Sequence, residues 1–368
     1  MLREGESVIP AEQAVRLETA APAGYPFAPK LPGRIPSLDG LRAISIVLVV
    51  LSHASGTVNF ESIQFLRDLG NFGVRVFFVI SGFLITTLLL KEQAKTGGIS
   101  IRNFYLRRTF RIFPAFYFFV AVIGALNLSG MVSLLPGDLT HALTYTMNYH
   151  HPHAWYMGHI WSLSVEEQFY LLWPATLALV GLRKGFRFAF AVVLAAPFLR
   201  YGTWLWITRH EGTDQQFQNI ADALAVGCLM AGLFNLLSEN PRYQRFLRSR
   251  WFYLAPLAAF AANATQGHPR VWLFAGQTAA TLAIALCIDR FVRYPNGLFG
   301  RFLNWAPLRF VGLLSYSLYL WQQVFINRNS NAAIAAFPLN VILAFAAALV
   351  SYYLIERPFL RLKDRIHA

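Results

Sequence analysis

The sequence predicts an all-α, polytopic integral membrane protein with about ten transmembrane helices and both termini in the cytoplasm. Of its 368 residues, 56% are hydrophobic and only 14% are charged, whereas soluble domains carry about a quarter charged residues. Apolar segments close to the length of a membrane span recur along the chain. Lys and Arg residues gather in alternate loops between these segments, as the positive-inside rule requires.

The chain divides into three parts by composition. Residues 1–36 are polar, contain six prolines and several glutamates, and include no apolar run. We interpret them as a flexible cytoplasmic tail, because they resemble neither a signal peptide nor a transit peptide. Residues 37–355 form the predicted transmembrane domain, and residues 356–368 form a basic cytoplasmic tail. We expect no attached extracytoplasmic domain after residue 354.

Ten apolar segments are candidates for membrane spans, since a spanning helix needs about 20 residues. The seventh segment is short and the tenth is the most apolar. In chain order, the segments are 40–58, 72–90, 113–132, 161–181, 187–207, 218–237, 252–264, 271–289, 306–327 and 336–354.

The charges of the loops orient these spans. The predicted cytoplasmic side carries 24 Lys and Arg residues, and the opposite side carries four. The net charge of +14 is therefore a signal of topology, and no nucleic-acid-binding motif accompanies it. Cys228 and Cys287 lie in apolar runs without the spacing of a disulfide framework or a metal site, and we predict no metal.

The first span places an arginine and a histidine on one apolar helix. Ser37 and Asp39 are candidate helix caps. His53 follows Arg42 by eleven residues, a rise of about 16 Å, and lies within about 20° of the same face. Arg42 alone is also explained as a positive-inside anchor, and His53 alone as a hydrogen-bonding partner between helices.

The second span contains Arg75 near its outer end and Ser81-Gly82 in its middle. Small residues such as Ser81 and Gly82 also allow close packing of helices, and this explanation is favoured for them. A buried arginine is costly in a membrane, so Arg75 is a functional candidate.

Three arginines precede the third span. Arg107, Arg108 and Arg111 lie just before Pro114, which is expected to open the helix at a position that tolerates proline. Clustered guanidinium groups suit phosphate oxygens. An ordinary positive-inside anchor is the simpler alternative.

The fourth span carries two carboxylates. His159 lies at the outer interface, and Glu166 and Glu167 follow inside the span. Ser164 and Glu167 fit a capping box, which gives Glu167 a structural explanation. Glu166 has none and is expected to pair with a cation or to face a polar cavity, with Arg75 and His53 as the candidate cations. Later in the chain, Tyr316 adds a hydroxyl to the ninth span, where packing of aromatic residues is an equally simple explanation.

Six motifs, in this order, carry a resemblance to a known family. They are "SLDGLRAISIVLVVLSH", "FFVISGFLI", "RRTFRIFPAFY", "WSLSVEEQFYLLWP", "SYSLYLW" and the closing Glu356-Arg357-Pro358. With them, the chain resembles the membrane-bound acyltransferase-3 family, whose members O-acylate sugars and related acceptors. Two residues depart from the pattern: Gln322 stands where many members have histidine, and Arg75 where many have Asp or a neutral residue.

The resemblance implies a membrane O-acyltransferase that moves an acyl group, most often acetyl, from cytoplasmic acyl-CoA to a hydroxyl of a carbohydrate acceptor. It implies His53 as the catalytic base, oriented by Glu166, and Arg42, Arg107, Arg108 and Arg111 as the donor site. Arg75, Ser81, Glu167, His159 and Tyr316 are the expected supporting residues.

The implied partners are acyl-CoA as a donor substrate, the carbohydrate acceptor and the lipid bilayer, with no bound cofactor and no nucleic acid. The expected location is a bacterial-type cytoplasmic (inner) membrane. A transporter or flippase for a lipid-linked sugar or small solute remains the alternative, since it also uses buried charges. The identity of the acceptor and of the acyl group, the oligomeric state, and direct transfer against an acyl-histidine intermediate stay open.

Overall fold

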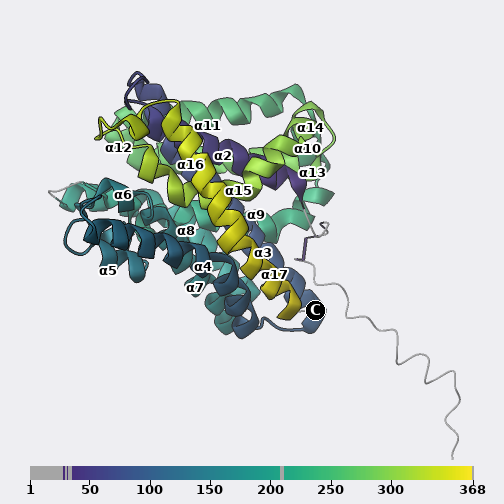
Figure 1. The fold of residues 1–368 in the computed structure, drawn as a ribbon. Coiled ribbons are helices and arrows are strands. Elements are labelled where there is room, and N and C mark those ends of the chain that lie inside the picture. Colours follow the sequence, from purple (N-terminus) through teal and green to yellow (C-terminus); the bar gives the residue numbers. More distant parts are fainter. Residues whose placement is uncertain (1–27, 30, 32–34, 208–210, 367–368) are drawn as a thin grey trace, which may run out of the picture.

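Helices account for the architecture of this chain, as predicted. The computed structural model describes residues 28, 29, 31, 35–207 and 211–366, and no β-strand occurs among them. The predicted tail 1–36 lies almost wholly outside the described residues. The helices form one bundle, and the C-terminal helices α16 (Leu339–Ser351) and α17 (Arg357–Ile366) run one after the other across the front of the view in Figure 1.

Seven helical segments are long and apolar enough to cross a membrane, within the described part of the chain. They contain, in order, α2 (Pro36–Ala54), α3 (Gln64–Thr96), α4 (Ile101–Leu128), α8 (Leu182–Trp206), α9 (Phe217–Glu239), α13 (Gln277–Arg293) and α16 (Leu339–Ser351). The other three predicted segments coincide with α7 (Trp161–Val180), α11 (Leu254–Ala264) and α15 (Ala306–Phe325). The count of ten spans and the cytoplasmic location of both termini therefore stay predictions.

Shorter helices connect the long ones. They are α5 (Asp138–Leu143), α6 (Trp155–Gly158), α10 (Pro241–Arg248), α12 (Pro269–Val271) and α14 (Leu298–Leu303). Two π-helical turns, Trp272–Gly276 and Tyr352–Glu356, interrupt the segments that contain α13 and α16. Such turns are frequent at functional sites.

Two helix starts differ from the prediction. The N-cap of α2 is Ile35 and Pro36 follows it, so neither Ser37 nor Asp39 caps the helix. Ser37 donates instead to Asn304. Helix α4 begins at Ile101 and contains Pro114 in its interior. Arg107, Arg108 and Arg111 therefore lie within the helix, not before it.

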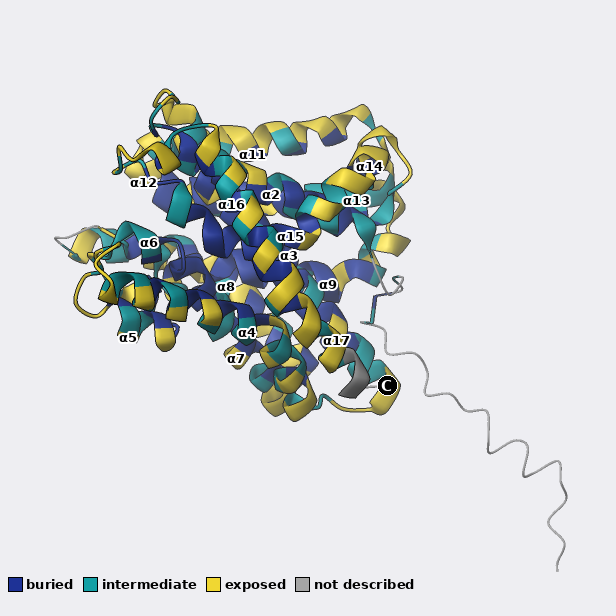
Figure 2. Cartoon of the chain, viewed as in Figure 1, coloured by how far each residue is buried: buried dark blue, intermediate teal, exposed yellow. Residues whose placement is uncertain are grey.

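Helix α2 packs between α3 and α15, in the region where Figure 2 shows most of the buried residues. Glycines allow the close approach. A Cβ atom on Gly312 would lie 1.8 Å from the carbonyl oxygen of Asp39, and one on Gly73 would lie 2.6 Å from that of Ser45. The side chains of Ala43, Ile46 and Val49 are buried in these contacts.

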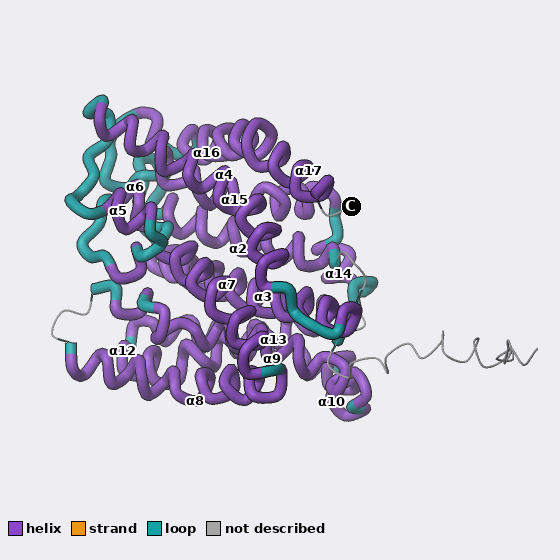
Figure 3. The backbone as a smooth tube through the Cα atoms, turned by 90° about the horizontal axis from the view of Figure 1, so that it is seen from below, coloured by secondary structure: helices purple, strands orange, loops and turns teal. Residues whose placement is uncertain are grey.

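Helices α3 and α9 also meet through glycine. Figure 3 shows α3, α9 and α13 side by side. A Cβ atom on Gly82 would lie 2.0 Å from the carbonyl oxygen of Leu224, and one on Gly227 would lie 2.2 Å from that of Val79. The sequence-based expectation of close packing at Ser81-Gly82 is confirmed for Gly82.

We expect Gly82→Ala to destabilise the fold by about 1–3 kcal/mol, because the added methyl group must push α9 away from α3. The midpoint of thermal unfolding in detergent measures this loss. Gly202→Ala is the matched control, since Gly202 is also helical and a Cβ atom there would meet no atom within 4 Å. An equal unfolding temperature for Gly82→Ala and the unmodified chain would contradict the expectation.

Candidate functional site

Helix α2 carries both Arg42 and His53, as predicted. Eleven residues of α-helix separate their Cα atoms by about 16 Å along the axis and return to nearly the same face. Each side chain is half-buried. The polar groups around them form two levels, which we call the histidine level and the arginine level.

At the histidine level, two neighbouring amides of α15 hold His53. Nδ1 of His53 lies 2.7 Å from Oε1 of Gln322, and Nε2 of His53 lies 3.2 Å from Nε2 of Gln323. The orientation of Gln323 is fixed, because its Oε1 accepts the backbone N–H of His159. Its NH2 group therefore donates to Nε2 of His53, which leaves the ring proton on Nδ1, where it is donated to Gln322.

His159 is the second histidine of this level and is buried. Its Nδ1 lies 2.8 Å from Oε1 of Gln323 and its Nε2 lies 3.0 Å from the carbonyl oxygen of Leu320. Gln323 therefore bridges the two histidines. The supporting role of His159 stays a prediction, and the bridging amide of Gln323 was not foreseen.

At the arginine level, Glu166 is held by three groups. Ser81 and Tyr170 donate hydrogen bonds to its Oε1, and a guanidinium nitrogen of Arg108 lies 3.8 Å away. The guanidinium of Arg108 lies 3.5 Å from the ring centroid of Tyr170. The prediction that Glu166 pairs with His53 or Arg75 is wrong, because the described partner is Arg108.

The four predicted donor arginines separate into two groups. Arg42, Arg108 and Arg111 lie close enough for their charges to act on one another. Arg42 is also 3.7 Å from Asp39. Arg107 instead pairs with Glu92 at 3.0 Å, on the surface of the bundle. Adjacent helical residues point about 100° apart, so Arg107 and Arg108 cannot share a target.

Arg75 lies in a different polar cluster. Its guanidinium donates to Gln277 and, at 3.3 Å, to Thr281, and it lies 5.2 Å from the ring centroid of Trp272. Arg75 was predicted to support the site. The structure instead places it with Gln277, Thr281 and Trp272, and it is not among the described contacts of His53. Arg75 and Ser81 are six residues apart and therefore point about 120° apart around α3.

A row of polar side chains on α7 and α15 connects the two levels. Ser162, Glu166 and Tyr170 recur every four residues and share one face of α7, and His159 lies just before the start of that helix. The hydroxyl of Tyr319 donates to the carbonyl oxygen of His159 at 2.8 Å and lies 2.5 Å from Oγ of Ser162.

Two further predictions concern Glu167 and Tyr316. Helix α7 begins at Trp161 without a side-chain cap, so Ser164 and Glu167 form no capping box. Ser164 donates instead to the carbonyl oxygen of Ile160. Tyr316 donates to the carbonyl oxygen of Ile112 on α4 at 3.0 Å and so joins α15 to the helix of the arginines.

Sequence reasoning missed several residues of the site. Gln323, Trp155 and Tyr170 contact residues that were predicted, and Glu356 is buried and accepts a hydrogen bond from Ser317 at 2.8 Å. The charge of Glu356 acts on Arg111. Tyr170 follows Glu166 by four residues, and this spacing was a usable signal.

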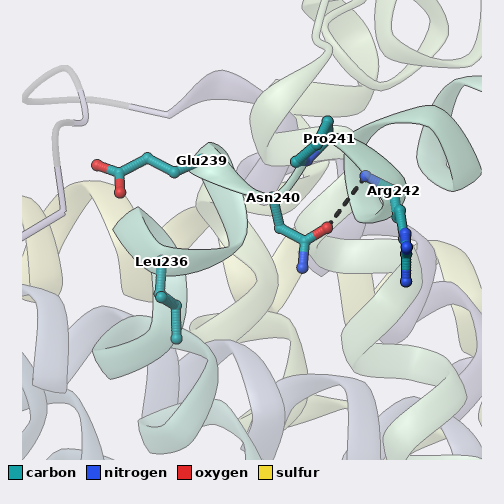
Figure 4. Close-up of a pocket in the computed structure, with 5 residues that line it drawn as sticks. All are labelled: Leu236, Glu239, Asn240, Pro241 and Arg242. Atoms are coloured by element: carbon teal, nitrogen blue, oxygen red, sulfur yellow. Dashed lines mark hydrogen bonds between the residues drawn. The ribbon is translucent and has the colours of Figure 1, made fainter.

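A surface hollow of about 400 Å³ lies elsewhere, at the junction of α9 and α10. Leu236, Glu239, Asn240, Pro241 and Arg242 line it, and Oδ1 of Asn240 accepts the backbone N–H of Arg242 (Figure 4). None of the predicted site residues lines this hollow, so it is not the candidate site.

The segment before α7 covers the histidine level. The ring of Trp155 meets that of His53 edge-on, with centroids 5.7 Å apart. Upstream, the rings of His151 and His153 lie 4.9 Å apart, and His150 lies 3.0 Å from Asp138. Burial lowers the pKa of His151 and of His153 from the usual value, and their mutual repulsion lowers that of His151 further.

Comparison with known proteins gives one family. The family model of the acyltransferase-3 type, described as an acyltransferase domain, matches residues 35–357. The chain is 29% identical over 366 residues to the Staphylococcus aureus (strain COL) protein named "Putative O-acetyltransferase SACOL0978", covering 88% of this chain and 57% of that protein. It is 28% identical to "O-acetyltransferase OatA" of S. aureus (strain NCTC 8325 / PS 47), covering 89% and 57%. The match thus spans little more than half the length of these relatives. No solved structure matches.

Acidification is expected to loosen the segment that covers His53. The pKa values of His151 and His153 are lower in the folded protein than in the unfolded chain, so the unfolded chain binds more protons as the pH falls below about 6.5. The free energy of unfolding of this segment therefore keeps its full value above that pH and decreases below it. Hydrogen exchange of residues 147–160 at pH 7.5 and pH 5 measures the change, which His151→Gln with His153→Gln should reduce. An unchanged pH response in the double variant would contradict this assignment.

Proposed function

The chain belongs to the acyltransferase-3 family of acyltransferase domains, and from that premise we propose that it is a membrane O-acyltransferase. It moves an acyl group, most simply acetyl, from acyl-CoA to a hydroxyl group of a carbohydrate acceptor. The observation that carries the proposal is the position of Arg42 and His53 on one face of α2, each within a cluster of matching chemistry.

The arginine level suits the charged end of the donor. Coenzyme A carries phosphate groups at one end and its thioester at the end of a long flexible arm. Arg42, Arg108 and Arg111 present guanidinium groups, which suit phosphate oxygens. Glu166 holds Arg108 in this role and does not orient His53. Arg107 is assigned no contact with the donor, because it pairs with Glu92.

The histidine level suits the reactive end. Gln322 accepts the Nδ1 proton of His53, so the lone pair of the ring lies on Nε2. The NH2 group of Gln323 donates to that lone pair, and the acceptor hydroxyl takes the place of this amide when it binds. On the proposed route, Nε2 takes the proton of the acceptor hydroxyl, and the oxygen forms a bond to the acyl carbon. The C–S bond breaks, and the thiolate of coenzyme A recovers the proton from His53.

A second route uses the same nitrogen as a nucleophile. Nε2 of His53 first forms a bond to the acyl carbon, and the C–S bond breaks to release the thiolate of coenzyme A. The acceptor oxygen then forms a bond to the acyl carbon as the bond to Nε2 breaks, and the hydroxyl proton passes to the thiolate. Both routes require acyl-CoA at the arginine level and an acceptor at the histidine level. They differ in whether an acylated protein forms without the acceptor.

The proposal includes the direction of transfer. With both termini in the cytoplasm of a bacterial-type cell, the arginine level faces the cytoplasm, where acyl-CoA is made. The histidine level then lies toward the outer side, where a surface polysaccharide or glycan would approach. A transporter or flippase would use the same buried charges to move a solute without forming a covalent product.

We expect Arg108→Gln to weaken binding of acetyl-CoA by about tenfold or more, since it removes a charged contact to phosphate. Isothermal titration of the purified full chain in detergent measures the affinity. Arg107→Gln is the matched control and should bind acetyl-CoA as the unmodified chain does. Equal losses in the two variants, or no binding by the unmodified chain, would contradict the donor site. Solute flux without acetyl-CoA binding would favour the transporter.

We expect His53→Ala to reduce acetyl transfer by at least about 100-fold, the usual contribution of a general base. Transfer of radiolabel from acetyl-CoA to cell-surface glycan in isolated membranes measures the loss. The control His268→Ala removes an exposed histidine at the start of α12 and should retain full activity. Full transfer by His53→Ala would exclude both routes. Radiolabel on the protein itself, formed without acceptor and absent from His53→Ala, would select the acyl-histidine route.

A further inference from the structure

Two arginines meet beside His53 at the outer end of α2. A guanidinium nitrogen of Arg328 donates to the carbonyl oxygen of Ser52 at 2.9 Å. The hydroxyl of Ser52 donates to the carbonyl oxygen of Arg67 at 2.7 Å. Burial lowers the pKa of Arg328 from its usual value, and the nearby charge of Arg67 lowers it further. The guanidinium of Arg328 therefore lies next to the residue that precedes His53, and the backbone of Arg67 contacts the same residue. The charge of Arg67 is near enough to act on Arg328.

Neither cation is neutralised by a carboxylate. Among the described residues, the ion pairs within 4.0 Å include neither Arg67 nor Arg328. Nε of Arg328 is buried and has no hydrogen-bond partner. By contrast, Arg107, Arg108 and Arg200 each have a carboxylate within 4.0 Å. Two guanidinium groups whose charges act on one another, with no carboxylate within 4.0 Å among the described residues, form a site of positive charge that suits an anion.

An aromatic ring completes this group. The guanidinium of Arg328 lies 5.1 Å from the ring centroid of Trp155, whose ring also contacts His53. Trp155 is held in place because its Nε1 donates to the carbonyl oxygen of Ile326 at 3.0 Å. The C–H faces of sugar rings pack well against aromatic rings, and a tryptophan beside the base suits such packing.

The positive-inside rule does not explain these arginines. The sequence assigns only four Lys and Arg residues to the outer side, and Arg67 and Arg328 are two of them. Both gather at the end of α2 that carries His53. Their position therefore fits recognition of a ligand on that side, where the acceptor must approach.

We propose that Arg67, Arg328 and Trp155 form the acceptor subsite, and that the acceptor is an anionic carbohydrate whose carboxylate or phosphate group binds the two guanidinium groups. This inference rests on the proposed function, since it treats His53 as the reacting base. Trp155 positions the sugar ring, and the two arginines place its charged group away from the hydroxyl that reacts. A phospholipid headgroup shares this anionic chemistry and is the competing occupant.

Binding of a matched pair of sugars tests the subsite. The purified full chain in phosphatidylcholine nanodiscs is dialysed against radiolabelled tetragalacturonate or its methyl ester, which lacks the negative charges. The unmodified chain should bind the charged sugar about tenfold more tightly. Arg328→Gln should reduce this preference to about twofold or less, Arg67→Gln should reduce it in part, and Arg328→Lys should retain part of it.

Arg270→Gln is the matched control. Arg270 is exposed on the predicted outer side and lies 5.9 Å from the ring centroid of Trp204, so it repeats the arginine–tryptophan contact away from His53. This variant should keep the full preference. Unchanged acetyl-CoA binding by Arg328→Gln shows that the variant is folded. An equal loss in Arg270→Gln, or no preference in the unmodified chain, would overturn the subsite.

Two further outcomes separate the competing explanations. Phospholipid retained by the unmodified chain but lost in Arg328→Gln, together with no sugar preference, would assign the arginines to a lipid headgroup and overturn the proposal. The binding measurement does not depend on catalysis, so His53→Ala should keep the preference for the charged sugar. Charge-dependent binding without any acetyl transfer would support the subsite while the proposed function fails.

Discussion

The placement of Arg42 and His53 on one apolar helix is the constraint on which the site depends. Polar groups inside a membrane must find partners within the protein, because hydrocarbon offers none. The rigid rise of α2 holds the two side chains about 16 Å apart, so partners are needed at two depths. The neighbouring helices supply arginine and carboxylate at one depth and amide groups at the other. Glycines at the contacts with α3 and α15 bring these helices close enough for side chains to reach across.

The two levels belong to one network through α7 and α15. Gln323 joins His53 to His159, and Tyr319 joins His159 to Ser162. One turn further along α7, Glu166 anchors Arg108. A shift of α7 along its axis would therefore disturb both levels together. This coupling explains why Glu166, which does not contact His53, lies in the same row as His159, which reaches His53 through Gln323.

The sequence was sufficient to predict how side chains lie around a single helix. It was insufficient to predict which side chains of different helices contact one another. Periodicity correctly placed Arg42 and His53 on one face, because that depends on α2 alone. The same rule could have separated Arg107 from Arg108, and Arg75 from Ser81, by their angles around the helix. The partner of Glu166 could not be predicted, since it depends on which helix packs against α7. The helix starts at Pro36 and Ile101, with Ile35 and Ser100 as N-caps, were missed, because Ser37, Asp39 and Pro114 gave plausible local signals.

The partner of His53 has a chemical consequence for the proposed reaction. In the pattern of the acyltransferase-3 family, many members have a histidine at the position of Gln322. A catalytic histidine is often oriented by a carboxylate. Here a neutral amide accepts the Nδ1 proton, which fixes the tautomer but provides only a dipole to stabilise an imidazolium. A proton taken by Nε2 is therefore weakly held, and its transfer to the departing thiolate is favoured as soon as the C–S bond breaks. On the alternative route, the same neutral partner leaves an acylated ring with little stabilisation of its positive charge, which makes it reactive toward the acceptor hydroxyl. Gln322 thus favours the second step of either route, in which His53 gives up its proton or its acyl group, and it does so as a neutral partner.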